Sequence, residues 1–154
     1  MNDLQEIRDS IIHRAFPELM DEDIQIEYTA LDDAVFECGL LTPEGFYIHT
    51  DETMKEAPRE VVEGGLAHEL THLVVDKKSN RNTLILERIA YRLARGYKTL
   101  VERDTDVQTI LRGYGRQLVA FLEYCEQQGF EHYKEDGLSI REIKALLSVG
   151  SANT

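Results

Sequence analysis

The chain has 154 residues, which is the length of one domain and enough to bury a hydrophobic core. Hydrophobic residues make up 42% and charged residues 30% of the sequence, which excludes a disordered or collagen-like chain. The formal net charge of −12 repels nucleic acid phosphates and anionic lipid headgroups. We therefore expect neither a nucleic acid nor a membrane as a partner.

The start of the chain, MNDLQEIRDSII, is acidic and holds no long apolar run, so it does not resemble a secretory signal. No stretch approaches the ~18 apolar residues needed to cross a bilayer. The two cysteines, Cys38 and Cys125, fit no metal or redox spacing, and we expect both to be reduced and packed. Together these features predict a cytoplasmic protein.

The N-terminal third of the sequence predicts one helix and a small sheet. Apolar residues recur at helical spacing over residues 3–16, and the pattern stops at Pro17. A period of two then marks three strands, at 24–28, 34–41 and 46–49. Proline and glycine within residues 42–45 predict a hairpin turn between the last two of them. We expect a three-stranded antiparallel sheet at about residues 24–49.

Beyond Asp51 the sequence predicts helices to its end. The expected ranges are about 58–76, 83–95, 98–112, 117–128 and a last short helix after residue 139. Pro58 suits a first helical position, and Ser139 with Glu142 forms an S-x-x-E capping box. The order of helix, small sheet and helices indicates an α+β fold, in a single domain over residues 1–154.

The clearest chemical signal is His68-Glu69-Leu70-Thr71-His72, an H-E-x-x-H sequence within the helix expected at 58–76. Four residues are about 1.1 helical turns, so the two imidazoles leave one face of the helix about 6 Å apart along its axis. They are placed to bind one zinc ion, Zn²⁺, together. Glu69 lies off the line of ligation, where it is placed to act as general base.

A catalytic zinc ion usually takes three protein ligands, so a third ligand is expected downstream. Glu102 and Asp106 share one helix face in an E-x-x-x-D pattern, and a carboxylate one turn after a ligand is well placed to accept the N–H of a ligating histidine. Glu87 is the rival ligand, because the helix at 83–95 would return past the metal on simple antiparallel packing. Asp104 and Asp106 remain alternatives as direct ligands.

With these residues the sequence resembles the gluzincin zinc metallopeptidases, the family of thermolysin. It is most similar to small single-domain archaeal and bacterial proteins that carry an E-R-x-T-D signature, as in residues 102–106 here. The resemblance covers about residues 46–115. It implies hydrolysis of a peptide or protein substrate. It also implies zinc ligands His68, His72 and Glu102, with Glu69 as general base and Asp106 orienting a ligand histidine.

The resemblance further implies an edge strand that holds the substrate backbone just before the active-site helix, which is the position of residues 46–49. It also implies a tyrosine or histidine that stabilises the oxyanion, for which the candidates are Tyr114, His132 and Tyr133. His49 either lines the cleft or is a surface histidine. The 29 residues between His72 and Glu102 exceed the connection in thermolysin, so a whole helix is inserted here.

Two further features leave alternatives open. Gly64 and Gly65 lie about one turn before His68, where they either leave room beside the metal or allow close helix packing. The chain is a metallopeptidase, a latent or non-proteolytic zinc-binding protein that acts through a partner, or a helical interaction module with an accidental motif. In the latent protein, the C-terminal residues 148–154 or the last helix would cover the cleft.

Overall fold

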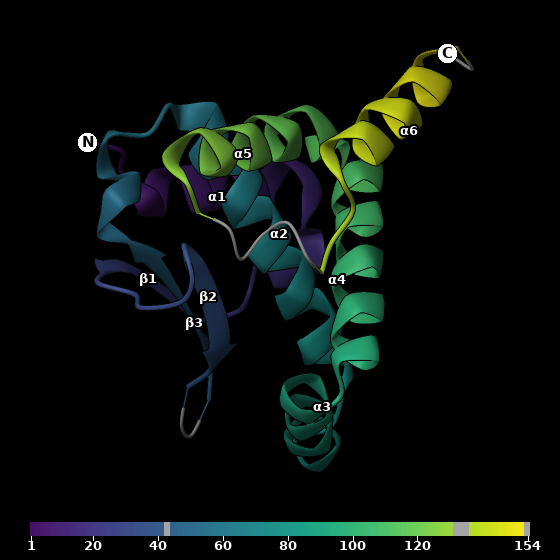
Figure 1. The fold of residues 1–154 in the computed structure, drawn as a ribbon. Helices are drawn as coiled ribbons and strands as arrows, with labels where there is room; N and C mark the ends of the chain where they lie inside the picture. The colour runs from purple at the N-terminus through teal and green to yellow at the C-terminus, as the bar shows by residue number, and fades with distance from the viewer. Residues whose placement is uncertain (42–43, 131–135, 153–154) are drawn as a thin grey trace.

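A computed structural model describes residues 1–41, 44–130 and 136–152. The strands are β1 Ile24–Thr29, β2 Phe36–Leu40 and β3 Phe46–Asp51. The helices are α1 Leu4–Ala15, α2 Arg59–Lys78, α3 Arg81–Leu93, α4 Arg95–Thr109, α5 Gly115–Gln128 and α6 Ile140–Ala152. Single turns of 3₁₀-helix lie at Pro17–Leu19 and Glu52–Glu56. The α+β fold is confirmed, with the small sheet on one side of a helical body (Figure 1).

The sheet is mixed, so the prediction of a purely antiparallel sheet was wrong. The strand order is β1-β3-β2, with β3 parallel to β1 and antiparallel to β2. The connection from β1 to β2 arches over the end of β3, because Leu31 N–H donates to the Asp51 carboxylate (2.9 Å) and Asp51 N–H to the Val35 carbonyl (2.8 Å). β1 and β2 therefore stand one strand apart, and β3 fills the gap.

The central place of β3 also corrects the expected substrate-binding edge strand. Residues 46–49 pair on both sides, with Ile48 opposite Ile26 of β1 and opposite Cys38 of β2. The strand at the outer edge nearest α2 is β2, whose Phe36 packs against α2. The antiparallel pairing of β2 with β3 confirms the hairpin, although residues 42–43 of its turn lie outside the described residues.

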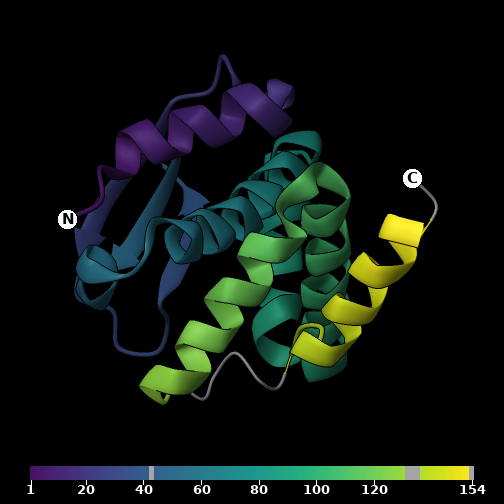
Figure 2. The same cartoon turned by 90° about the horizontal axis from the view of Figure 1, so that it is seen from above.

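Helix α2 runs through the middle of the molecule, with α1 and the sheet on one side and α4 and α5 on the other (Figures 1 and 2). It is buried on nearly all sides, as expected of a helix with apolar residues around its whole circumference. Its fully buried side chains include Val62, Leu66, Leu70 and Leu73. The H-E-x-x-H sequence therefore lies in the core of the fold.

Helices α4 and α5 contact successive parts of α2 because the chain bends between them. Residues Ile110–Tyr114 form a turn of π-helix that contains Gly113 at φ 94°, a left-handed conformation that favours glycine. Before the bend, Thr109 of α4 meets Thr71 of α2 through a 3.0 Å hydroxyl contact. After it, α5 passes the earlier turn of α2 that carries Gly64.

The paired glycines of α2 serve close packing, which settles the alternative that the sequence left open. A Cβ at Gly64 would overlap the backbone carbonyl of Gln117 in α5. A Cβ at Gly65 would overlap the aromatic ring of Phe36 in β2. Atoms of α5 and β2 thus occupy the space that a side chain at either glycine would need. The low helix propensity of glycine is offset by the close packing of the Gln117 backbone and the Phe36 ring against α2.

We expect Gly64→Ala to destabilise the fold by about 1–3 kcal/mol, the usual cost of forcing an extra methyl group into a packed core. The Gln117 carbonyl is backbone and cannot rotate away as a side chain would. Gly96→Ala is the matched control, since a Cβ there meets no atom within 4 Å and should add up to about 1 kcal/mol of helix propensity. Urea unfolding of both variants measures the difference; equal midpoints would contradict the packing role.

The remaining elements follow the sequence closely. The capping box of α6 is confirmed, with Ser139 N–H donating to Glu142 (2.8 Å) and Glu142 N–H donating to Ser139 Oγ (3.1 Å). Arg103 of α4 also pairs with Glu142 (2.9 Å), which ties α6 to α4. Both cysteines are free thiols, with Cys125 buried and Cys38 partly buried.

Candidate metal centre

The two histidines of α2 face the same side, as their spacing predicts. The His68 and His72 rings lie edge to face with centroids 4.8 Å apart, and their Nε2 atoms are 3.1 Å from each other. Both side chains are largely buried, at 12% and 18% exposed. Two imidazole nitrogens therefore point at a common position beneath the protein surface.

Glu102 of α4 completes the group. One of its carboxylate oxygens lies 3.0 Å from His68 Nε2, and the other lies 3.2 Å from His72 Nε2. Within the described residues, these three side chains form the group whose ligand atoms lie within 4.8 Å of one another. The predicted triad of His68, His72 and Glu102 is thus brought together by the packing of α4 on α2.

The donor set fits a zinc ion in chemistry and in spacing. Two imidazole nitrogens and one carboxylate form a His₂Glu set, which occurs in catalytic zinc sites. In a tetrahedral site with metal–ligand bonds of about 2.0–2.1 Å, the ligand atoms lie about 3.3 Å from one another. Here the two imidazole nitrogens lie 3.1 Å apart, and each lies 3.0 or 3.2 Å from a different oxygen of the Glu102 carboxylate. Small shifts of the side chains would accommodate the ion.

Asp106 lies behind His68, one helical turn after Glu102. Its Oδ1 is 2.9 Å from His68 Nδ1, and its Oδ2 accepts the Leu138 N–H at 2.8 Å. Gly137 allows this close approach, since a Cβ there would overlap the Asp106 carboxylate. Asp106 thereby contacts the His68 ring at Nδ1, while Nε2 of the same ring faces Glu102.

The ionisable side chains of this cluster shift one another's pKa values. Burial disfavours the charged form of His68, but hydrogen bonds to Asp106 and Glu102 outweigh it and hold the pKa of His68 well above its usual value. Burial likewise opposes ionisation of Glu102, yet its hydrogen bonds to His68 and His72 hold the pKa of Glu102 below the ordinary range. The buried carboxylate therefore stays ionised, as a metal ligand must be, whereas His68 would release its proton when it binds an ion.

Glu69, the predicted base, is buried at the side of this cluster. Its neighbours come from two elements: Cys38 on β2 and Tyr91 on α3. Burial raises the pKa of the Cys38 thiol well above its usual value, and the nearby Glu69 carboxylate adds to the shift by its charge and by a hydrogen bond. Glu69 also adds to the raised pKa of Tyr91. The carboxylate thus lies between β2 and α3, beside the ligand group.

Tyr91 is a residue of the site that sequence reasoning missed. Its hydroxyl donates to a Glu102 carboxylate oxygen at 2.5 Å. Burial, together with the charges of Glu102 and Glu69, raises the pKa of Tyr91. The hydroxyl therefore keeps its proton and remains a donor. No short motif links positions 91 and 102, because the two side chains meet only through the packing of α3 on α4.

The rival ligands are not part of the group. Glu87 on α3 is absent from the three residues that come together, and Asp104 is exposed on α4. Asp106 contacts a ring nitrogen of His68 rather than the common position. The inserted helix α3 does return past the candidate metal centre. The side chain that it places there is Tyr91, which contacts Glu102, and not Glu87.

The structure brings none of the described oxyanion-donor candidates into contact with the three ligand residues. Tyr114 is buried against Phe16, with ring centroids 6.4 Å apart, and its role as an oxyanion donor stays a prediction. His132 and Tyr133 lie outside the described residues. His49 pairs with Glu37 (3.0 Å) and Glu27 (3.5 Å) on the sheet surface, which agrees with its interpretation as a surface histidine.

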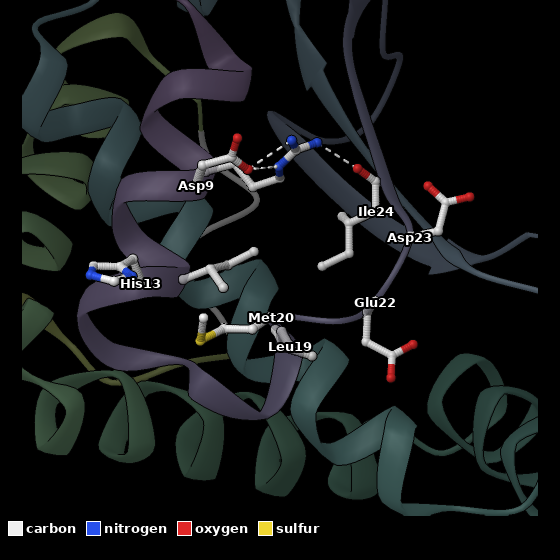
Figure 3. Close-up of a pocket in the computed structure, with 9 residues that line it drawn as sticks. Asp9, His13, Leu19, Met20, Glu22, Asp23 and Ile24 are labelled. Carbon is white, nitrogen blue, oxygen red and sulfur yellow. Dashed lines mark hydrogen bonds and ion pairs between the residues drawn. The ribbon is translucent and has the colours of Figure 1, made fainter.

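Two hollows accompany these elements. One of about 440 Å³ lies between α1 and the start of β1, and contains His13 and several carboxylates but none of the ligand residues (Figure 3). The other, of about 320 Å³, is lined by Leu40, Phe46 and Leu84 and by Asp76, which is one turn after His72 on α2. Neither hollow is lined by His68, His72 or Glu102.

Comparisons with known proteins identify no relative of this chain. No family model matches the chain, and no curated protein or solved structure is significantly similar to it. In the described part of the chain, no helix is both long and apolar enough to cross a membrane. The chemistry of the candidate metal centre must therefore be inferred from its own residues.

Proposed function

We propose that this protein is a zinc-dependent metallopeptidase of the gluzincin type, which hydrolyses peptide bonds in the cytoplasm. The observation that carries the proposal is the convergence of His68, His72 and Glu102 with mutual contacts of 3.0–3.2 Å. Asp106 behind His68, and Glu69 next to His68 on α2, add an orienting residue and a candidate base to this group. The free thiols of Cys38 and Cys125 are consistent with a reducing compartment.

In this proposal each residue has a separate task. His68, His72 and Glu102 would hold the ion, which supplies a Lewis acid and lowers the pKa of a bound water toward ~7. Glu69 accepts the proton of the attacking water and passes it to the leaving amine. Asp106 keeps the His68 ring in its tautomer, and Tyr91 is a positioning residue that holds the Glu102 carboxylate.

A second candidate function is a latent zinc-binding protein. It is favoured by one observation, the burial of the Glu69 side chain, which is 7% exposed and lies near the Cys38 thiol of β2. In such a protein, the base becomes available only when a partner moves β2 away from α2. The latent protein binds zinc as the peptidase does, but does not cleave an unstructured substrate on its own.

The test is zinc addition to protein stripped with a chelator. Binding to the folded state at 100 times the dissociation constant stabilises by about 2.7 kcal/mol, which raises the Tm of a domain of this size by roughly 5–10 °C. Thermal unfolding and cleavage of an unfolded protein substrate are measured on the same samples. An unchanged Tm would refute the metal centre. A raised Tm without cleavage would favour the latent protein.

A further inference from the structure

Helix α3 is turned with its apolar side toward solvent. Four aliphatic residues occupy an arc of about 100° on its outer face, at the positions i, i+1, i+4 and i+8. Their exposed fractions are 54% for Ile85, 69% for Leu86, 49% for Ile89 and 82% for Leu93. We call these four residues the α3 stripe. In Figure 1 α3 lies at the lower end of the molecule, away from α1 and α5.

Two polar residues on the opposite face of α3 have partners in the protein. Tyr91 donates to Glu102, and Arg88 pairs with Asp76 of α2 at 3.0 Å. Leu84 is the fully packed apolar residue of that face. The metal centre and its surroundings thus require the polar side of α3 to face inward. In the described part of the chain the apolar side stays about half or more exposed, unlike that of an ordinary surface helix.

The α3 stripe also has a charged border of one sign. Between residues 84 and 98 the chain has four basic residues, Arg88, Arg92, Arg95 and Lys98, and one acidic residue, Glu87. Arg88 and Lys98 already pair with Asp76 and Asp136, so Arg92 is the cation on which the border depends. The whole chain has a net charge of −12, so this segment departs from the rest of the molecule. Arg92 is exposed, and it follows Ile89 by three positions and directly precedes Leu93. A cation therefore stands at the edge of the apolar arc.

We propose that the α3 stripe and Arg92 form a docking surface for an acidic amphipathic helix of a protein partner. Leucine-type side chains of the partner would cover the α3 stripe, and its glutamate or aspartate side chains would meet the basic border. An exposed aliphatic stripe of this kind marks an interaction site, and the charge of its border selects the partner.

Two other occupants fit the charges less well. In a second copy of this chain, antiparallel pairing of two α3 helices places the basic border against itself, and like charges oppose that contact. An anionic membrane would attract the basic border of the α3 stripe. It would also repel the rest of the molecule, because the whole chain has a net charge of −12. A helical partner contacts the α3 stripe alone and avoids that repulsion.

The experiment measures binding of a labelled helical peptide to the full chain by fluorescence anisotropy. The peptide has 16 residues, with leucines at i, i+3, i+4 and i+7 and glutamates along one flank; a second peptide has lysines in place of the glutamates. We expect the glutamate peptide to bind and Leu93→Ser to weaken it about tenfold. Arg92→Glu should reverse the preference between the two peptides.

Leu111→Ser is the control, because Leu111 is 73% exposed in the bend between α4 and α5 and lies outside the α3 stripe. It should bind like the unaltered chain. Docking is independent of hydrolysis, so chelator-treated protein should bind equally well. Equal binding by all variants, or no binding of the glutamate peptide, would overturn the proposal. It would also be overturned if Leu93→Ser instead abolished self-association in sedimentation, or binding to phosphatidylserine vesicles.

Discussion

Glu69→Gln is expected to keep one bound zinc ion and to lose at least about 100-fold in the rate of peptide hydrolysis, the usual contribution of a general base. Glutamine has nearly the same shape as glutamate, so the packing of this buried position between β2 and α3 is retained. It cannot accept the proton of the attacking water. Because Glu69 is not one of the three residues that meet at the common position, metal content should not change.

The measurement combines metal content with cleavage of an unfolded protein substrate at saturating zinc. Glu60→Gln is the matched control, since Glu60 is an exposed carboxylate in the first turn of the same helix. It should retain both zinc and turnover. Full hydrolysis by Glu69→Gln would show that the proton goes elsewhere, and loss of zinc would mean that Glu69 is a ligand.

Glu102→Ala is expected to weaken zinc binding by more than the ~10–100-fold typical of a residue behind a ligand, because it removes a ligand itself. Two histidines one turn apart remain, and the Tyr91 hydroxyl loses the acceptor that now lies 2.5 Å away. Glu87→Ala removes a carboxylate from α3 that is not part of the group and should bind zinc normally. Metal content after dialysis and a zinc titration measure both variants.

A folding defect must be separated from loss of a ligand in this comparison. Glu102→Gln keeps an acceptor for Tyr91 and nearly the same volume, but it removes the charge that the ion requires. We therefore expect Glu102→Gln to fold with an unchanged far-ultraviolet circular dichroism spectrum and to bind zinc weakly. Normal zinc binding by Glu102→Ala together with loss in Glu87→Ala would reverse the assignment of the third ligand.

The helices could be read from apolar spacing because that signal is local. The helix expected over residues 3–16 is α1 at Leu4–Ala15, and the one expected near 58–76 is α2 at Arg59–Lys78. Strand order could not be read in the same way. The alternation in β1 is the same whether its neighbour is parallel or antiparallel, and the choice depends on how the connection arches over Asp51.

The residues of the candidate metal centre likewise differ in whether a local sequence signal predicts them. His68, Glu69 and His72 stand within five residues, so helix geometry alone predicts their placement. Glu102 and Asp106 could be predicted only from the E-x-x-x-D pattern. No sequence pattern predicts Tyr91, since its contact with Glu102 depends on the orientation of α3. The outward stripe on α3 has the same cause, because the contacts of Tyr91 with Glu102 and of Arg88 with Asp76 turn the polar side of the helix inward.

The bend at Gly113 links the stability of the core to the geometry of the site. No side chain crowds this glycine, so its requirement is purely conformational, at φ 94°. It sets the angle at which α4 leaves α5, and α4 carries both Glu102 and Asp106. Sensitivity to mutation therefore extends beyond the residues of the candidate metal centre, to a bend eleven positions along the chain from Glu102.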